Sequence, residues 1–216
     1  MTHYRHRISA FTLMLAAAWI ADGAAAKDKP RPAAKVVEAA LADSFEAKGQ
    51  AGLDRLKQDK MQQICSEYEG KPVPDELAQQ IIDEASAGLR FPADGQYFGD
   101  WRGGEKIAKT GTGLQSSDDP AIANGGNCYA CHQMAAEEMA YGTLAPTLAE
   151  YGKLRGNSEP IVRYAWTRLW NSHAYNPCSH MPRFGAAGIL TEAQLKDVMA
   201  YLFDPQSPVN QSGAAP

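Results

Sequence analysis

Two cysteines separated by two residues and followed at once by a histidine constrain this chain more than any other feature. They are Cys128, Cys131 and His132. This spacing is the attachment signature of a c-type haem. Two thiols one turn apart can each add to a vinyl group of the same porphyrin, and the next imidazole can then reach the iron. We therefore expect one covalently bound haem c, with His132 as the proximal iron ligand.

The side chain on the other face of the iron decides between electron transfer and binding of a small ligand. Downstream candidates are His173, His180 and Met181. Met181 precedes a proline in a predicted loop before the last helix, which is the usual setting of the methionine in a His/Met cytochrome. We therefore predict Met181 as the distal ligand, with His180 as the main alternative. Such a closed iron favours electron transfer over gas or peroxide handling.

Other residues are expected to support this centre. The ring of His132 needs an acceptor for its second N–H, and the carbonyl of Pro146 is a candidate, although an ordinary turn proline is equally compatible with the position. Arg155, Arg183 and Trp101 are candidate partners of the haem propionates, because carboxylates removed from water need donors.

The N-terminus reads as a targeting segment. Arg5 and Arg7 precede a short apolar run that ends in Ala24-Ala25-Ala26. This order is typical of a secretory signal peptide, here residues 1–26, and the run is shorter than a membrane span requires. We expect a periplasmic protein without a membrane span after cleavage. A formal net charge of −4 with no basic run makes nucleic acid an improbable partner.

Two cysteines remain outside the motif, Cys65 and Cys178. Because disulfides persist in exported proteins and an even pair is left over, we favour a bond between them. Two buried thiols, or one thiol reserved for sulfur chemistry, are the alternatives.

Apolar residues at helical spacing predict an all-α fold. Residues 27–95 form a helical N-terminal extension, 96–204 a class I cytochrome c-like domain and 205–216 a flexible tail. In that domain a helix from about residue 100 to 111 should cross a last helix that Thr191 caps, and Gly103 and Gly104 would permit close approach. The predicted helices cover residues 33–47, 53–65, the stretch between Pro74 and Gly88, 100–111, 160–171 and 191–203.

Two runs together make the sequence similar to a particular group. They are Gly125-Gly126-Asn127-Cys128-Tyr129-Ala130-Cys131-His132-Gln133 and Met181-Pro182-Arg183-Phe184-Gly185. The chain resembles the SoxX family, the monohaem subunits of the SoxAX cytochrome complex of bacterial thiosulfate oxidation. The resemblance covers about residues 100–203.

The resemblance implies thioether links at Cys128 and Cys131, and His132 and Met181 as axial ligands. It also implies a periplasmic heterodimer with a SoxA-like cytochrome c subunit. That complex joins thiosulfate oxidatively to a cysteine of a SoxYZ-like carrier protein, an L-cysteine S-thiosulfotransferase-type reaction. The catalytic cysteine belongs to the SoxA subunit, so we expect no catalytic residue on this chain. A small cytochrome c is an expected downstream electron acceptor. A free-standing periplasmic cytochrome c serving another respiratory enzyme is the alternative.

Overall fold

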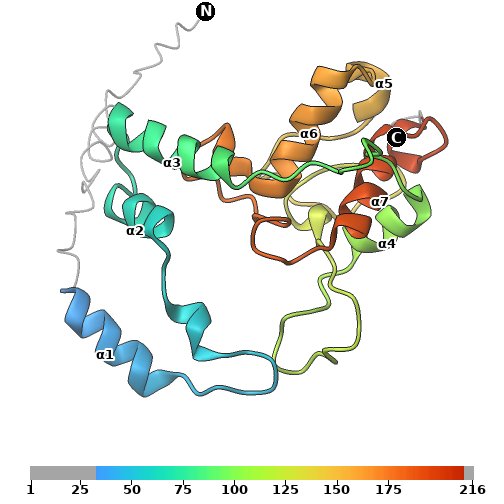
Figure 1. The fold of residues 1–216 in the computed structure, drawn as a ribbon. Helices are drawn as coiled ribbons and strands as arrows, with labels where there is room; N and C mark the ends of the chain where they lie inside the picture. Colours follow the sequence, from blue (N-terminus) through green and yellow to red (C-terminus); the bar gives the residue numbers. More distant parts are fainter. Residues whose placement is uncertain (1–32, 212–216) are drawn as a thin grey trace, which may run out of the picture. The chain divides into compact units, whose positions relative to one another are not determined.

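The computed structural model describes residues 33–211, and the predicted signal peptide lies outside that range. The chain divides into two compact units, one up to Ser44 and one from Phe45 onward. Helix α1 (Ala34–Ser44) belongs to the first unit. The second unit contains η1 (Leu53–Leu56), α2 (Lys60–Glu67), α3 (Asp75–Ala87), α4 (Trp101–Lys109), η2 (Cys128–Ala130), α5 (Tyr151–Arg155), α6 (Glu159–Asn171), η3 (Ser172–Ala174), α7 (Glu192–Phe203) and η4 (Pro208–Asn210) (Figure 1).

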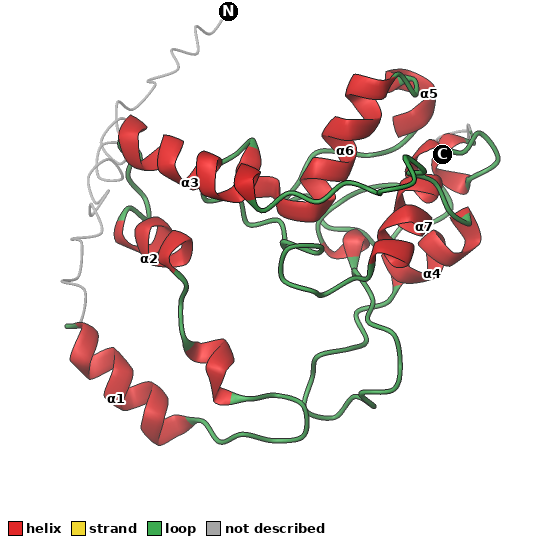
Figure 2. Ribbon diagram, viewed as in Figure 1, coloured by secondary structure: helices red, strands yellow, loops and turns green. Residues whose placement is uncertain are grey.

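Helices joined by loops make up the described part of the chain, with no β-strand in it (Figure 2). The all-α prediction is therefore confirmed. No helix within residues 33–211 is long and apolar enough to cross a membrane.

Helices α4 and α7 cross closely, as the sequence indicated. A Cβ atom on Gly104 would overlap the carbonyl oxygen of Asp197 and lie 2.7 Å from Cβ of Tyr201. Only a glycine allows the two backbones this separation. The Asp197 carboxylate also accepts a hydrogen bond of 2.8 Å from the Asp100 backbone N–H, at the start of α4. Helix α7 begins with a capping box between Thr191 and Gln194.

The main core joins α4, α6 and α7. Trp166, Leu195, Met199 and Tyr201 are almost fully buried in it, and the remaining buried members are Ile107, Ala108, Tyr129, Met134, Ala135, Tyr151, Val162, Ala165, Leu169, Phe184, Leu190, Val198, Leu202, Phe203 and Val209. Because Tyr129 lies within the cysteine–histidine motif and Met134 follows it by two residues, this core also supports the predicted haem site.

A smaller second core holds part of the predicted extension in place. Met61 of α2 and Ile81 and Ala85 of α3 pack with Ala174 of η3. Most of the predicted extension, from Phe45 to residue 95, therefore belongs to the same compact unit as the rest of the chain. The division that we predicted at residue 95 is not where the two compact units separate.

The predicted helix over residues 53–65 is two elements. A 3₁₀ turn, η1, ends at Leu56, and α2 starts after Asp59. The Asp59 carboxylate accepts a hydrogen bond from the Gln62 backbone N–H, while the Gln62 side chain accepts one from the Asp59 N–H. This capping box satisfies the first free N–H groups of α2 and fixes its start.

The predicted flexible tail is wrong for residues 205–211. The Ser207 hydroxyl donates to the Tyr201 carbonyl at 2.5 Å, and the Asn210 amide donates to the Leu202 carbonyl at 3.0 Å. These bonds pair carbonyl groups at the end of α7 that the helix leaves open. Val209 is buried in the main core. Residues 212–216 lie outside the described range.

Candidate functional site

The Cys128–His132 motif begins against the end of α4. The Gly126 N–H donates to the Ile107 carbonyl at 2.8 Å, and the Asn127 N–H donates to the Thr110 carbonyl at 2.9 Å. Asn127 takes a left-handed conformation with φ of 46° and leads into the 3₁₀ turn η2. Asparagine tolerates that conformation better than most residues. The motif is thus fixed to α4 at the residue before its first cysteine.

The imidazole of His132 is oriented by a backbone carbonyl. Its Nδ1 lies 2.7 Å from the carbonyl oxygen of Pro146, the candidate acceptor that the sequence offered beside the reading of an ordinary turn proline. The neighbouring Ala145 N–H donates to the Cys131 carbonyl at 3.1 Å, so the proline loop is tied to the motif. With Nδ1 in this bond, Nε2 is the ring nitrogen left to bind a metal.

The four cysteines divide into two pairs with different chemistry. Cys65 and Cys178 form a disulfide, with Cα atoms 5.4 Å apart, which confirms the favoured pairing. Cys128 and Cys131 are free thiols. Burial raises the pKa of the Cys128 thiol to about 12, because a thiolate there would lose its hydration. Two free thiols one turn apart beside an oriented imidazole are the donor set that covalent haem attachment requires.

A pair of tyrosine hydroxyls connects the motif to α7. The hydroxyl groups of Tyr129 and Tyr201 lie 2.7 Å apart, and Tyr129 Oη accepts a bond of 3.1 Å from the Ala135 N–H. Burial, together with the bond to Tyr129, raises the pKa of Tyr201 above its usual range. The Tyr201 hydroxyl therefore stays protonated, and its bond to Tyr129 links the motif to α7.

Met181 lies in a loop that is held at several points. The Ser172 hydroxyl donates to the Met181 carbonyl at 3.1 Å, and the Met181 N–H donates to the Ser179 hydroxyl at 3.2 Å. Met181 and Cys128 are both partly buried and pack against the main core. The structure thus places the first thiol of the motif and the predicted distal ligand on the same core.

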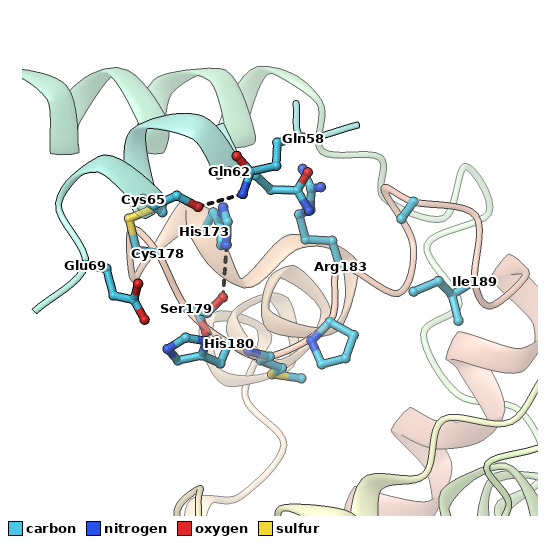
Figure 3. Close-up of a pocket in the computed structure, with 14 residues that line it drawn as sticks. Gln58, Gln62, Cys65, Glu69, His173, Cys178, Ser179, His180, Arg183 and Ile189 are labelled. Atoms are coloured by element: carbon cyan, nitrogen blue, oxygen red, sulfur yellow. Dashed lines mark hydrogen bonds between the residues drawn. A yellow bond between two sulfur atoms is a disulfide. The ribbon is translucent and has the colours of Figure 1, made fainter. Parts of the chain in front are cut away.

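The two histidines near Met181 have different surroundings. His173 is buried, and its Nε2 lies 3.1 Å from the Ser179 carbonyl. Burial lowers the pKa of His173, so it holds the loop as a neutral side chain. His180 is exposed. In Figure 3 the His173 ring points toward Ser179, and His180 stands on the other side of the loop.

The three candidate partners of the haem propionates make different contacts in the structure. Arg183 forms an ion pair with Asp59 at 2.5 Å. The Arg155 guanidinium lies 5.6 Å from the ring centroid of Tyr151. Trp101 is partly buried against the main core.

Two comparisons with known proteins bear on this arrangement. The family model described as Cytochrome c matches residues 117–204. An uncharacterized lipoprotein of Aquifex aeolicus is 37% identical over 161 residues, which cover 71% of this chain and 73% of that protein. Residues 117–204 of this chain form a cytochrome c domain.

The cytochrome c domain implies a covalently bound haem c and an electron-transfer role. The matched region contains both runs on which the resemblance rests. Cys128 to His132 lies near its start and Met181 in its second half. Cytochrome c domains are typical of proteins that act outside the cytoplasm.

One residue of this cytochrome c domain was missed by sequence reasoning. The Asn124 side-chain amide donates to the Ile189 carbonyl at 2.9 Å, and its backbone carbonyl accepts from the Gln194 side chain at 2.7 Å. Asn124 therefore links the loop before the motif to the segment between Met181 and α7, and to α7 itself. An asparagine in a polar, glycine-containing loop gives no sequence signal of such long-range bonds.

Proposed function

We propose that this protein is a periplasmic monohaem cytochrome c, the electron-transfer subunit of a SoxAX-like heterodimer. The observation that carries the electron-transfer part is the bond between His132 Nδ1 and the Pro146 carbonyl, 2.7 Å long. It holds the imidazole with Nε2 free to bind iron. A fixed imidazole directly after two free thiols is a site built for one covalently attached haem.

Each residue of the site has a distinct role in this proposal. Cys128 and Cys131 would hold the porphyrin by thioether bonds, and His132 and Met181 would be the ligands of its iron. The bound haem c supplies a one-electron Fe(III)/Fe(II) couple. A thioether ligand favours Fe(II) and raises the reduction potential. The Ser172 hydroxyl, which donates to the Met181 carbonyl, and the Ser179 hydroxyl, which accepts from the Met181 N–H, hold the backbone of Met181 in place for that role.

The ligation is tested by Met181→Leu in the purified holoprotein. We expect loss of the weak far-red sulfur-to-iron absorption band and a lower reduction potential. His180→Ala is the matched control, since that side chain is exposed on the same loop, and it should leave both unchanged. An unaltered spectrum in Met181→Leu, or band loss in the histidine variant alone, would contradict the ligand assignment.

The sulfur chemistry rests on the resemblance of two runs, the one around Cys128 to His132 and the one from Met181 to Gly185. In the proposed complex, a carrier-protein thiol and thiosulfate form a new S–S bond, and the thiol proton and two electrons are released. The cysteines of this chain offer no thiol for that step, because two belong to the haem motif and Cys65 and Cys178 are paired. This supports a catalytic cysteine on a SoxA-like partner, while this chain takes up electrons and passes them to an acceptor such as a small cytochrome c.

A pull-down from the periplasm of thiosulfate-grown cells tests this assignment. We expect a second c-type cytochrome to co-purify, and thiosulfate with a SoxYZ-like carrier protein to reduce the haem of the complex. Thiosulfate without the carrier is the control. Recovery of a lone monomer that thiosulfate and carrier do not reduce would instead support a free-standing electron carrier.

A further inference from the structure

We propose that α2 positions Met181 by holding the Met181 loop on both sides of the ligand, which makes Asp59 and Cys65 positioning residues for the sixth iron ligand. The Met181 loop means residues 178–183 here. The inference rests on the proposed function, in which Met181 binds the iron. It assigns a role to a helix that lies outside the region matched by the cytochrome c family model, residues 117–204.

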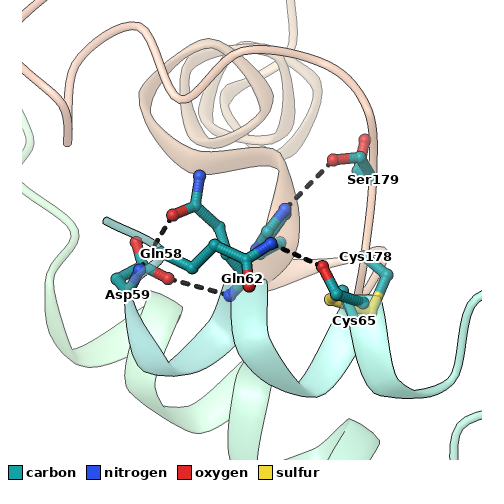
Figure 4. The surroundings of a disulfide bond; sticks show 8 residues. Gln58, Asp59, Gln62, Cys65, Cys178 and Ser179 are labelled. Carbon is teal, nitrogen blue, oxygen red and sulfur yellow. Dashed lines mark hydrogen bonds between the residues drawn. A yellow bond between two sulfur atoms is a disulfide. The ribbon is translucent and has the colours of Figure 1, made fainter. Parts of the chain in front are cut away.

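The first attachment precedes the ligand by three residues. Cys178 is bonded to Cys65, which lies in α2. Cys178 has a φ of 60°, a left-handed conformation that residues other than glycine seldom adopt. Such a conformation persists only where surrounding bonds enforce it, and the disulfide is a covalent one. Figure 4 shows it joining α2 to the segment that leads into Ser179.

The second attachment follows the ligand by two residues. Nη2 of Arg183 lies 2.5 Å from Oδ2 of Asp59, the N-cap residue of α2. The Arg183 side chain is only 20% exposed and that of Asp59 42%. An ion pair this sheltered resists solvent screening better than a fully exposed one. One short helix therefore holds both ends of a six-residue loop.

Helix α2 is itself packed against η3, the 3₁₀ turn whose first residue bonds the Met181 carbonyl. Met61 of α2 is buried in the second core against Ile81 and Ala174. Ala174 ends η3, and η3 begins with Ser172, whose hydroxyl donates to the Met181 carbonyl. The loop is thus held between two surfaces that are packed on each other.

A cavity of about 510 Å³ lies between α2 and the Met181 loop (Figure 3). Its α2 side is lined by Gln62, Cys65 and Ser66, and its loop side by the run from Cys178 to Arg183. Side chains do not fill this space, so the two attachments, rather than close packing, keep the loop at its distance from α2. Cutting either attachment would leave the loop free to shift into this space.

The test measures how readily Met181 leaves the iron. Imidazole added to the ferric holoprotein binds only when the methionine is displaced, so its apparent affinity reports the fraction of molecules with an open site. Asp59→Ser removes the contact to Arg183 but keeps an N-cap side chain for α2. Asp94→Ser is the matched control. Like Asp59, Asp94 accepts a hydrogen bond from a nearby backbone N–H, that of Gln96, and pairs with a cation. Its cation, Lys196, lies in α7 and not in the Met181 loop.

We expect imidazole to bind about fivefold more tightly to Asp59→Ser, the factor that corresponds to a sheltered ion pair of about 1 kcal/mol. Replacement of Cys65 and Cys178 together by serine should give about tenfold or more, and Asp94→Ser should match the wild type. The far-red sulfur-to-iron band should weaken only in Asp59→Ser and in the double serine variant.

If Asp59→Ser and the double serine variant both bind imidazole as the wild type does, and both keep the far-red band, the inference is overturned and the proposed ligation stays intact. An effect from only one attachment would overturn the claim that both ends matter. If the double serine variant yields no holoprotein, Asp59→Ser against Asp94→Ser decides the question. Absence of the band in the wild type would instead refute Met181 as the ligand.

Discussion

Replacing Gly104 with alanine should cost far more stability than replacing its neighbour Gly103. A Cβ on Gly104 would overlap the backbone carbonyl of Asp197 and lie 2.7 Å from Cβ of Tyr201, whereas a Cβ on Gly103 would meet the Asp197 carboxylate at 2.6 Å. A side-chain carboxylate can rotate away from a new methyl group. The backbone of α7 can only move as a helix, which would disturb the whole crossing.

The magnitude follows from two opposing effects. Glycine to alanine inside a helix gains about 1 kcal/mol from helix propensity, while forcing an extra carbon into a close-packed contact costs about 1–3 kcal/mol or more. At Gly104 the clash is with backbone, so we take the upper end and expect a net loss of about 2 kcal/mol. At Gly103 the two terms nearly cancel. For a unit of this size, about 2 kcal/mol lowers the melting temperature by about 4–8 °C.

Thermal and urea unfolding of both holoproteins, followed by circular dichroism at 222 nm, measure the difference. The Soret spectrum of each variant checks that haem is attached. Equal melting temperatures for the two variants would refute the argument that the glycine at position 104 is required by a backbone contact. A larger loss for Gly103→Ala would show that the Asp197 carboxylate, rather than its carbonyl, sets the distance between the helices.

Three further predictions concern other contacts. Tyr201→Phe leaves the Tyr129 hydroxyl without its partner and should lower the free energy of unfolding by about 1–2 kcal/mol in urea titrations. Gly142→Ala would push a Cβ into the Ala130 carbonyl and should reduce the ratio of Soret to protein absorbance, because it distorts the motif turn. The pKa of Asp59 is depressed, since bonds from Gln62 and its arginine partner outweigh the opposing effect of burial. Its stabilising contribution is therefore present above the unfolded pKa and lost as pH falls below about 4, so urea midpoints of wild type and Asp59→Ser should converge in acid.

The centre of the fold could be predicted because its signals are local or combine simple patterns. The helix after Thr191 has a capping box and a continuous apolar face, and Gly103-Gly104 marks where another helix could approach it. The position of one proline after the motif made Pro146 a candidate acceptor for His132 but left an ordinary turn equally compatible, and the structure has the contact. The disulfide followed from counting cysteines.

Helix α5 and the ordered part of the tail escaped prediction for different reasons. Helix α5 has only five residues, begins after a left-handed Glu150, and is held where Gly152 lies against the Phe203 backbone. The tail looked disordered from its proline, serine and glycine content. Residues 205–211 are instead held by bonds from Ser207 and Asn210 to carbonyls at the end of α7. The contact that holds α5 is remote in sequence, whereas the bonds of the tail are local but leave no mark in its composition.

The start of α2 is a different kind of miss, since its signal was local. Asp59 and Gln62 have the spacing of a capping box, but the apolar residues on both sides of Asp59 fit one helical period. Periodicity favoured a single helix, whereas the cap satisfies N–H groups that an uninterrupted helix would have used internally.

The order of the four cysteines along the chain has a consequence for how the protein reaches its final form. A chain that emerges from its N-terminus exposes Cys65 first, the two haem cysteines next, and Cys178 last. The native disulfide spans 113 residues and encloses the haem cysteines in the sequence. Oxidation of thiols in their order of appearance would therefore join Cys65 to Cys128, which blocks both the native bridge and haem attachment. Correct maturation requires that Cys128 and Cys131 be kept reduced, or already be bound to haem, until Cys178 has appeared.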